Sequence, residues 1–206
     1  NYWISEPDKG IYDAMNKGLN LASGDLICFL NAGDHYLNEN AIKYIHDKLD
    51  PEAEVIYSDM LTTNLISGQS WHISYKDITH KQDLFNSDGF AHCCTYYTKD
   101  AINKVGNFNE SYKIVADLEW NYRALIKHDL KYQYIKTISA DFKTGGISNN
   151  LNCRSIWENE NKKIRQDFFS NFERFIFPKV ILKINLLRRI SGKLFGWQLN
   201  RIYKNN

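Results

Sequence analysis

SEPDKGIYDAMNKGLNLASGDLICFLNAGD, residues 5–34, is the most informative stretch of this chain. Apolar side chains recur at helical spacing between residues 10 and 22, and Ser23-Gly24 is expected to end that helix. The short apolar run LICFL, residues 26–30, is typical of a strand buried on both faces. It ends in the polar, turn-prone sequence Asn31-Ala32-Gly33-Asp34. A helix, a buried strand and a polar loop in this order indicate an α/β protein.

Helix and strand patterns continue to alternate in the sequence that follows. We expect further helices over residues 38–49, 98–105, 116–128 and 155–172, and further strands over residues 54–59, 69–75, 92–97 and 131–139. This order predicts a mostly parallel central sheet flanked by helices. Ligands of such sheets bind beyond the carboxyl ends of the strands, where we expect the loop 31–34 and Asp59.

Composition excludes several classes of protein. Apolar residues make up 43% and charged residues 24% of the 206, which is globular rather than disordered composition. No apolar run reaches the ~18 residues of a membrane-spanning helix. The net charge of +2 gives no reason to expect nucleic-acid binding. The four cysteines form no C-x-x-C pair, so we expect reduced thiols in a cytoplasmic protein rather than a zinc or disulfide framework.

Charge is distributed unevenly along the chain. Residues 171–206 carry eight Lys and Arg but one acid, a net +7, whereas residues 1–170 carry a net −5. We expect the basic residues to belong to a helical extension over residues 151–206, which follows a domain over residues 1–150. The extension is too charged to span a bilayer, and we expect residues 171–206 to lie on an anionic membrane surface. A helix packed on the body, with its basic side chains in solvent, is the alternative.

The stretch 5–34 resembles the middle motif of glycosyltransferase family 2, as found in bacterial enzymes that build cell-surface polysaccharides. The residues that fall on the pattern are Gly10, Asp13, Ala14, Asn16, Gly18, Gly24 and Asp25. Later landmarks follow in the expected order: Phe90-Ala91-His92, the G-x-F-x-E-like turn of residues 105–110, Ala116–Trp120 and Gly145–Ser148. The resemblance covers about residues 1–150. It implies a GT-A fold, which is Rossmann-like, and sugar transfer from a nucleotide-sugar donor to a saccharide or lipid-linked acceptor, usually with inversion.

The resemblance also implies a divalent cation, Mg²⁺ or Mn²⁺, which would offset the charge of the leaving diphosphate. The family normally supplies two carboxylates one residue apart after a strand. Their positions here are Asn31 and Gly33, and Asp34 is the remaining carboxylate. We therefore expect weak metal binding, with Asp34 as the metal ligand and Asn31 in contact with the donor.

Roles for other residues follow from the same resemblance. Asp117 matches the acid that takes the proton of the acceptor hydroxyl, although an Asp at this helix start also caps the helix. Asp8, Lys9, Asp13 and Asn16 are donor-contacting candidates, with a solvated helix face as the alternative. His92 and Glu119 are candidates for acceptor contacts, and His92 also for contact with the diphosphate.

A complete enzyme of this family begins with an apolar strand and an Asn-containing loop, and continues with a second strand that ends in an acid. Both precede the middle motif, and this chain does not contain them. We therefore expect a cytoplasmic, peripherally membrane-bound glycosyltransferase, or a part of one. The alternative is a non-catalytic binding or interaction module derived from a glycosyltransferase.

Overall fold

A computed structural model describes residues 3–87, 89–144 and 153–178. The chain divides into two compact units, Asn1–Phe168 and Phe169–Asn206. Helix α6 (Arg154–Phe168) therefore belongs with the first unit. In the second unit, residues 171–178 are helical. The boundary predicted at residue 150, the Gly145–Ser148 motif and most of the basic segment lie outside the described residues.

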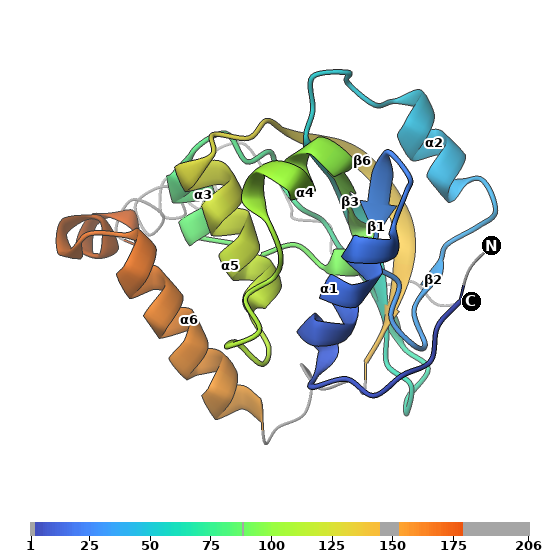
Figure 1. Cartoon of the computed structure of the whole chain (residues 1–206), viewed down its shortest axis with the longest axis horizontal. Coiled ribbons are helices and arrows are strands. Elements are labelled where there is room, and N and C mark those ends of the chain that lie inside the picture. Colours follow the sequence, from blue (N-terminus) through green and yellow to red (C-terminus); the bar gives the residue numbers. More distant parts are fainter. Residues whose placement is uncertain (1–2, 88, 145–152, 179–206) are drawn as a thin grey trace, which may run out of the picture. The chain divides into compact units, whose positions relative to one another are not determined.

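The first unit is built on a mixed sheet with the strand order β1-β5-β3-β6-β2, and β4 pairs with β3 (Figure 1). The strands are β1 (Leu26–Cys28), β2 (His35–Tyr36), β3 (Val55–Thr63), β4 (Ser70–Ile73), β5 (Thr95–Thr98) and β6 (Tyr132–Lys143). Among the described residues, only β3 and β6 pair in parallel, and the other strand pairs are antiparallel. The predicted α/β class is confirmed, but the prediction of a mostly parallel sheet was wrong. A short turn after β3 folds β4 back as a hairpin, and β5 enters the sheet in the opposite direction to β3.

Helices cover both faces of this sheet (Figure 1). Tyr96 and Tyr97 are neighbours on β5, so their side chains point to opposite faces. On one face Ile45 of α2 (Ala41–Asp47) lies in the cluster that contains Tyr96. On the other face the ring of Trp120 in α5 (Ala116–Tyr122) packs edge-on against Tyr97, with centroids 4.7 Å apart. The remaining helices are α1 (Ile11–Leu21), α3 (Lys81–Phe85) and α4 (Lys99–Val105).

Several predicted elements differ in extent from the observed ones. The strand in LICFL is limited to residues 26–28, and of these only Ile27 is buried. The predicted strand over residues 92–97 begins with a 3-10 turn, His92–Cys94, and the helix expected to reach residue 128 continues past Tyr122 as a π-helical turn, Arg123–Lys127. β3 extends to Thr63, so Asp59 lies inside a strand, at an irregularity of the β3–β6 register, rather than at a strand end.

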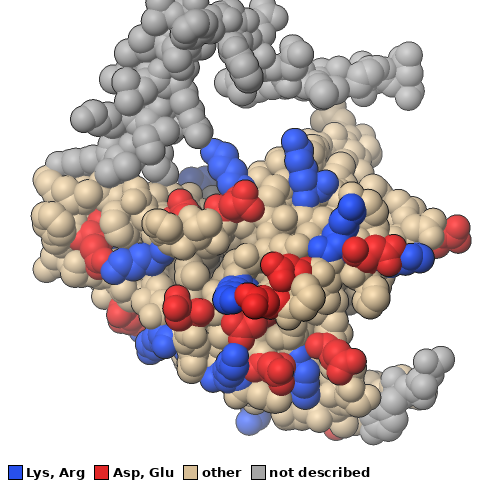
Figure 2. Space-filling view, turned by 90° about the horizontal axis from the view of Figure 1, so that it is seen from above, with Lys and Arg blue, Asp and Glu red and all other residues tan. Residues whose placement is uncertain are grey.

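Charged side chains on the described surface are mixed in sign. Figure 2 shows Lys and Arg interspersed with Asp and Glu over one face of the molecule. Ion pairs join, for example, Lys104 to Glu54 and Lys17 to Asp13. The net negative charge of residues 1–170 is therefore not gathered into one acidic surface on the face shown.

Candidate active site

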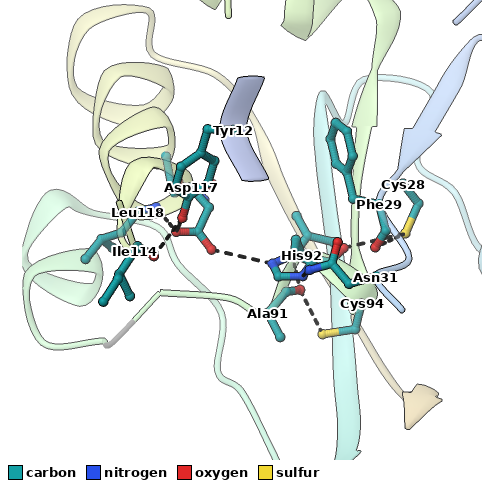
Figure 3. Close-up of polar contacts among 12 residues, drawn as sticks. Tyr12, Cys28, Phe29, Asn31, Ala91, His92, Cys94, Ile114, Asp117 and Leu118 are labelled. Carbon is teal, nitrogen blue, oxygen red and sulfur yellow. Dashed lines mark hydrogen bonds and ion pairs between the residues drawn. The ribbon is translucent and has the colours of Figure 1, made fainter. Parts of the chain in front are cut away.

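His92 connects the loop after β1 to helix α5, two segments that are distant in the sequence (Figure 3). Its Nε2 lies 2.5 Å from Nδ2 of Asn31, which follows β1. Its Nδ1 lies 3.8 Å from Oδ2 of Asp117, in the first turn of α5. Three residues predicted for different roles, Asn31, His92 and Asp117, are thus brought together at one point, which we call the His92 centre.

The carboxylate of Asp117 is held in a fixed orientation. Its Oδ1 accepts a hydrogen bond from the backbone N–H of Leu118 at 2.9 Å and another from the Tyr12 hydroxyl at 3.3 Å. Tyr12 is buried on α1, and its single hydroxyl hydrogen is shared between Asp117 and the nearer carbonyl oxygen of Ile114, which lies 2.6 Å away. Burial, and then the charge of Asp117, raise the pKa of Tyr12 far above its usual value, so the phenol stays neutral. Oδ2 is left facing His92.

The contacts of His92 define the tautomer of its neutral form. A neutral ring with its proton on Nδ1 satisfies both neighbours, because Nε2 then accepts from the amide of Asn31 while Nδ1–H points at Asp117. A protonated ring would require Asn31 to turn its carbonyl oxygen towards Nε2. Burial lowers the pKa of His92, but the hydrogen bond and the charge of Asp117 outweigh it, and the pKa is raised above 6.5.

The raised pKa of His92 predicts a pH dependence of stability. Because the folded state binds this proton more tightly than the unfolded state, the stabilisation is fully present below 6.5, the usual imidazole value, and is lost as the pH rises through the folded-state pKa. We expect the free energy of unfolding, measured by urea denaturation across this range, to fall with rising pH. The decline should flatten in His92→Gln and persist in His46→Gln, a histidine exposed on α2. An unchanged slope in His92→Gln would contradict the assignment.

Asp34 lies in the loop after β1, close to the end of β6. Its Oδ1 accepts a hydrogen bond from the backbone N–H of Lys143 at 3.0 Å, and its Oδ2 is buried without a hydrogen-bond partner. Burial raises the pKa of Asp34, while the Lys143 N–H and the nearby His92 act in the opposite direction. Gly33, with φ of +95°, provides the turn that presents this carboxylate. One oxygen of Asp34 is therefore available to a ligand.

The described side chains can hold a cation only together with ligands that the substrate phosphates supply. No group of three His, Cys, Asp or Glu side chains suited to a metal ion occurs within residues 3–87, 89–144 and 153–178. Mg²⁺, however, is commonly held by one or two carboxylates together with substrate phosphates and water. The unpartnered Oδ2 of Asp34 is such a ligand.

The donor-contacting candidates near α1 organise the beginning of that helix. Oδ1 of Asp8 accepts from the N–H of Gly10 at 2.9 Å, and Oδ2 of Asp13 accepts from the N–H of Lys9 at 2.8 Å. Asp13 also pairs with Lys17 at 3.3 Å, and the bond from the Lys9 N–H is the largest influence lowering its pKa. Asp8 and Lys9 are exposed. The structure shows the local role of these residues, and donor contact stays a prediction.

Asn16 has a different environment. It is only 4% exposed, and its amide exchanges two hydrogen bonds with the backbone of Phe108: Nδ2 donates to the carbonyl at 2.9 Å, and Oδ1 accepts from the N–H at 2.8 Å. Nδ2 also donates to Oε1 of Glu110 at 2.9 Å. Asn16 thus attaches α1 to the turn before α5. None of these contacts tests whether Asn16 binds the donor, so that role stays a prediction.

Replacing Asn16 with Ala should therefore destabilise the fold. We expect the free energy of unfolding in urea to drop by about 1–3 kcal/mol, because the Phe108 backbone groups lose buried partners. Asn20→Ala, on the exposed side of the same helix, is the matched control and should change stability by no more than about 0.5 kcal/mol. Equal stabilities of the two variants, with nucleotide affinity lost in Asn16→Ala, would instead indicate a donor contact.

Glu119 is not placed at the His92 centre. Its carboxylate is buried and pairs with Nε of Arg123, at 2.9 and 3.0 Å to its two oxygens. The same guanidinium donates to the carbonyls of Val105 and Asn107. This network holds α5 against the end of α4. Contact between Glu119 and an acceptor stays a prediction, because the described contacts of Glu119 are structural.

Two residues that the sequence interpretation missed support Asp117. Tyr12 contacts its carboxylate directly, and Glu160 of α6 accepts from the backbone N–H groups of Lys113 and Ile114 at 2.8 and 3.0 Å. Glu160 thereby fixes the loop whose carbonyl, at Ile114, holds the Tyr12 hydroxyl. Tyr12 lies inside the resembling stretch, but Glu160 lies outside it, and no sequence signal connected it to this site.

No protein-family model matches the chain. Over 151 residues it is 24% identical to a PGL/p-HBAD biosynthesis glycosyltransferase of Mycobacterium bovis, a match that covers 71% of this chain and 56% of the relative. It is 26% identical over 156 residues to an uncharacterized glycosyltransferase of Mycobacterium tuberculosis, covering 76% and 59%. The chain therefore spans a little over half the length of these curated relatives.

Among solved structures, the chain is similar to S. aureus TarS 1–349 in complex with UDP-GlcNAc. The identity is 12% and the TM-score 0.48, and the match covers 66% of this chain and 40% of that one. A TM-score below 0.5 does not by itself establish a shared fold. The sequence relatives, by contrast, confirm the resemblance to bacterial glycosyltransferases, while membership of family 2 itself stays a prediction.

Proposed function

We propose that this chain is the part of a glycosyltransferase that transfers a sugar from a nucleotide-sugar donor to a saccharide or lipid-linked acceptor in bacterial surface-glycan synthesis. The observation that carries the proposal is the His92 centre, which joins the loop of Asn31 to Asp117. All three residues lie within residues 1–150, the part of the chain that resembles family 2. The relatives named as glycosyltransferases support the same class. A GT-A-like arrangement and an inverting reaction are parts of this proposal.

An inverting transfer at this centre proceeds by in-line displacement. The acceptor hydroxyl oxygen forms a bond to the anomeric carbon while the bond from that carbon to the diphosphate oxygen breaks, and the electron pair leaves with the diphosphate. Oδ2 of Asp117, the oxygen that faces His92, takes the hydroxyl proton, because Oδ1 is already held by Tyr12 and Leu118. His92 lies between the base and the Asn31 loop, where Asp34 would hold a cation that neutralises the diphosphate.

The test of the proposal is turnover of a panel of UDP-, GDP- and dTDP-sugars by the full chain, with Mg²⁺ or Mn²⁺ present. We expect release of the nucleoside diphosphate, by transfer to an added acceptor or by slow hydrolysis, from at least one donor. Absence of turnover with every donor would favour the alternative, a non-catalytic binding or interaction module.

Asp34 gives a further expectation about metal. Asp34→Ala should raise the Mn²⁺ concentration for half-maximal turnover about tenfold or more, because it removes one direct carboxylate ligand. Asp47→Ala removes an exposed acid on α2, outside the His92 centre, and is the control. An unchanged metal dependence in Asp34→Ala would remove Asp34 from the cation site.

The net charge of +7 over residues 171–206 is the basis for proposing a peripheral position on the membrane. Within residues 3–87, 89–144 and 153–178, no helix has the length and hydropathy needed to cross a bilayer. We propose that residues 171–206 bind an anionic surface of the cytoplasmic leaflet, where each Lys or Arg contributes about 1 kcal/mol. Flotation with liposomes that contain anionic lipid should show binding that salt reverses. Equal recovery with neutral liposomes, or no flotation, would contradict this.

A further inference from the structure

A second candidate site lies outside the His92 centre. It is a hollow of about 560 Å³ that is largely open to solvent. The hollow lies between the segment that follows β4 and strand β6. Its lining consists of Ser74, Tyr75, Lys76, Asp77, Tyr134 and Lys136, and we call it the Lys76–Lys136 hollow.

A buried carboxylate fixes two side chains of this lining. Asp59 is only 2% exposed, and it accepts hydrogen bonds from the Tyr134 hydroxyl at 2.6 Å, the Tyr75 N–H at 2.9 Å and the Ser74 hydroxyl at 3.3 Å. Nε2 of His72 lies 2.9 Å from the same carboxylate. Tyr134 and Ser74 are therefore held in place before any ligand arrives.

The backbone of the lining is also fixed. The Tyr57 hydroxyl donates to the carbonyl of Lys76 at 2.7 Å and accepts from the N–H of Ile78 at 2.8 Å. The Tyr57 ring stacks on Tyr134, with centroids 5.5 Å apart and planes inclined by 28°. Tyr134 is half-buried, so part of its surface is exposed at the hollow as a rigid aromatic wall.

The lining carries two ammonium groups, whereas the Asp59 carboxylate that contacts Ser74 and Tyr134 is only 2% exposed. Lys76 and Lys136 are exposed, and neither forms an ion pair with another residue in the part of the chain that the structure describes. Asp77 contributes the single carboxylate of the lining. An aromatic face beside two unpaired ammonium groups suits a sugar ring that carries an anionic substituent.

We propose that the Lys76–Lys136 hollow binds an anionic sugar, a monosaccharide unit bearing a carboxylate or a phosphate, with the ring against Tyr134 and the anion between the lysines. The hollow is connected to the His92 centre, because the Tyr75 hydroxyl accepts from the N–H of Ala91, the residue before His92. A role as a distal acceptor subsite rests on the proposed transferase function, whereas binding of the sugar does not.

Binding is tested by amide chemical-shift titration of the full chain with glucuronate, glucose 6-phosphate, neutral glucose and inorganic phosphate. We expect saturable shifts around Ser74, Lys76 and Lys136 with both anionic sugars, and at least tenfold weaker binding of glucose and of phosphate. If inorganic phosphate bound as tightly as the anionic sugars, the sugar ring would not be recognised. If neutral glucose bound as tightly as the anionic sugars, the negative charge would not be recognised. No saturable shift with either anionic sugar would also overturn the proposal.

The variant Lys76→Gln/Lys136→Gln should raise the dissociation constant of both anionic sugars about tenfold, since both charges are removed from an exposed site. Lys48→Gln/Lys162→Gln, two exposed lysines outside the hollow, is the control and should leave binding unchanged. Equal affinities in the two double variants would overturn the proposal. These outcomes do not depend on Asp117, so they are distinct from failure of the transfer reaction.

Discussion

Asp117→Asn is expected to lower kcat for sugar transfer about 10²–10⁴-fold, the contribution of a positioned general base. An Asn side chain keeps the shape and can still accept from Tyr12 and Leu118, but it cannot take the acceptor proton. Release of nucleoside diphosphate, followed with the best donor of the panel, measures the loss. Donor affinity should change little, because the Asn31–Asp34 loop is untouched.

Asp129→Asn is the matched control for this experiment. Asp129 is exposed, and its φ of +51° is a conformation that Asn also tolerates. This variant should retain wild-type turnover and stability. Undiminished turnover in Asp117→Asn, with both proteins folded, would remove Asp117 from the mechanism and leave His92 as the nearest titratable alternative.

Trp120→Ala should have the largest effect on stability, a loss of about 3–5 kcal/mol in the free energy of unfolding. Trp120 is 0% exposed, packs against Tyr97 and donates from Nε1 to the carbonyl of Gly106 at 2.7 Å. It therefore fixes α5, and with it Asp117, to the sheet. Urea denaturation of the purified variant measures the loss.

Trp71 offers a control of the same residue type. It lies on β4 with 43% of its surface exposed, so Trp71→Ala should cost no more than about 1 kcal/mol. Similar losses in the two variants would contradict the assignment of Trp120 to the core. Trp120→Phe should fall between them, because it keeps most of the buried area and loses the hydrogen bond to Gly106.

The sequence predicted most elements but not how they are paired. Periodicity located α1, β3, α4 and β6, because each has a local apolar pattern. Parallel or antiparallel pairing is a tertiary property, and the strands that follow β3 turn back antiparallel. The buried face of α1 contains the polar side chains of Tyr12 and Asn16 besides the apolar Met15 and Leu19. Hydrophobic periodicity cannot identify Asn16 as buried, because its amide is stabilised by hydrogen bonds to the backbone of Phe108.

The candidate site was predicted in part. The resemblance identified Asn31, His92 and Asp117 separately, and the structure brings them together. It could not identify Tyr12, which contacts the Asp117 carboxylate directly. Nor could it identify Glu160, which holds the backbone of Ile114, whose carbonyl in turn contacts the Tyr12 hydroxyl. Such supporting contacts depend on the fold, since residues far apart in the chain must meet before they can act.

Calorimetric titration with nucleoside diphosphates tests the central claim most directly, namely that the Asn31–Asp34 loop and the His92 centre form one nucleotide-sugar site. UDP, GDP and dTDP are titrated into the wild-type chain and into Asp34→Ala, each with and without Mn²⁺. The account predicts saturable heat for at least one nucleotide that increases with Mn²⁺ and is weakened in Asp34→Ala. Absence of metal-dependent heat for all three would contradict the claim and favour the non-catalytic module.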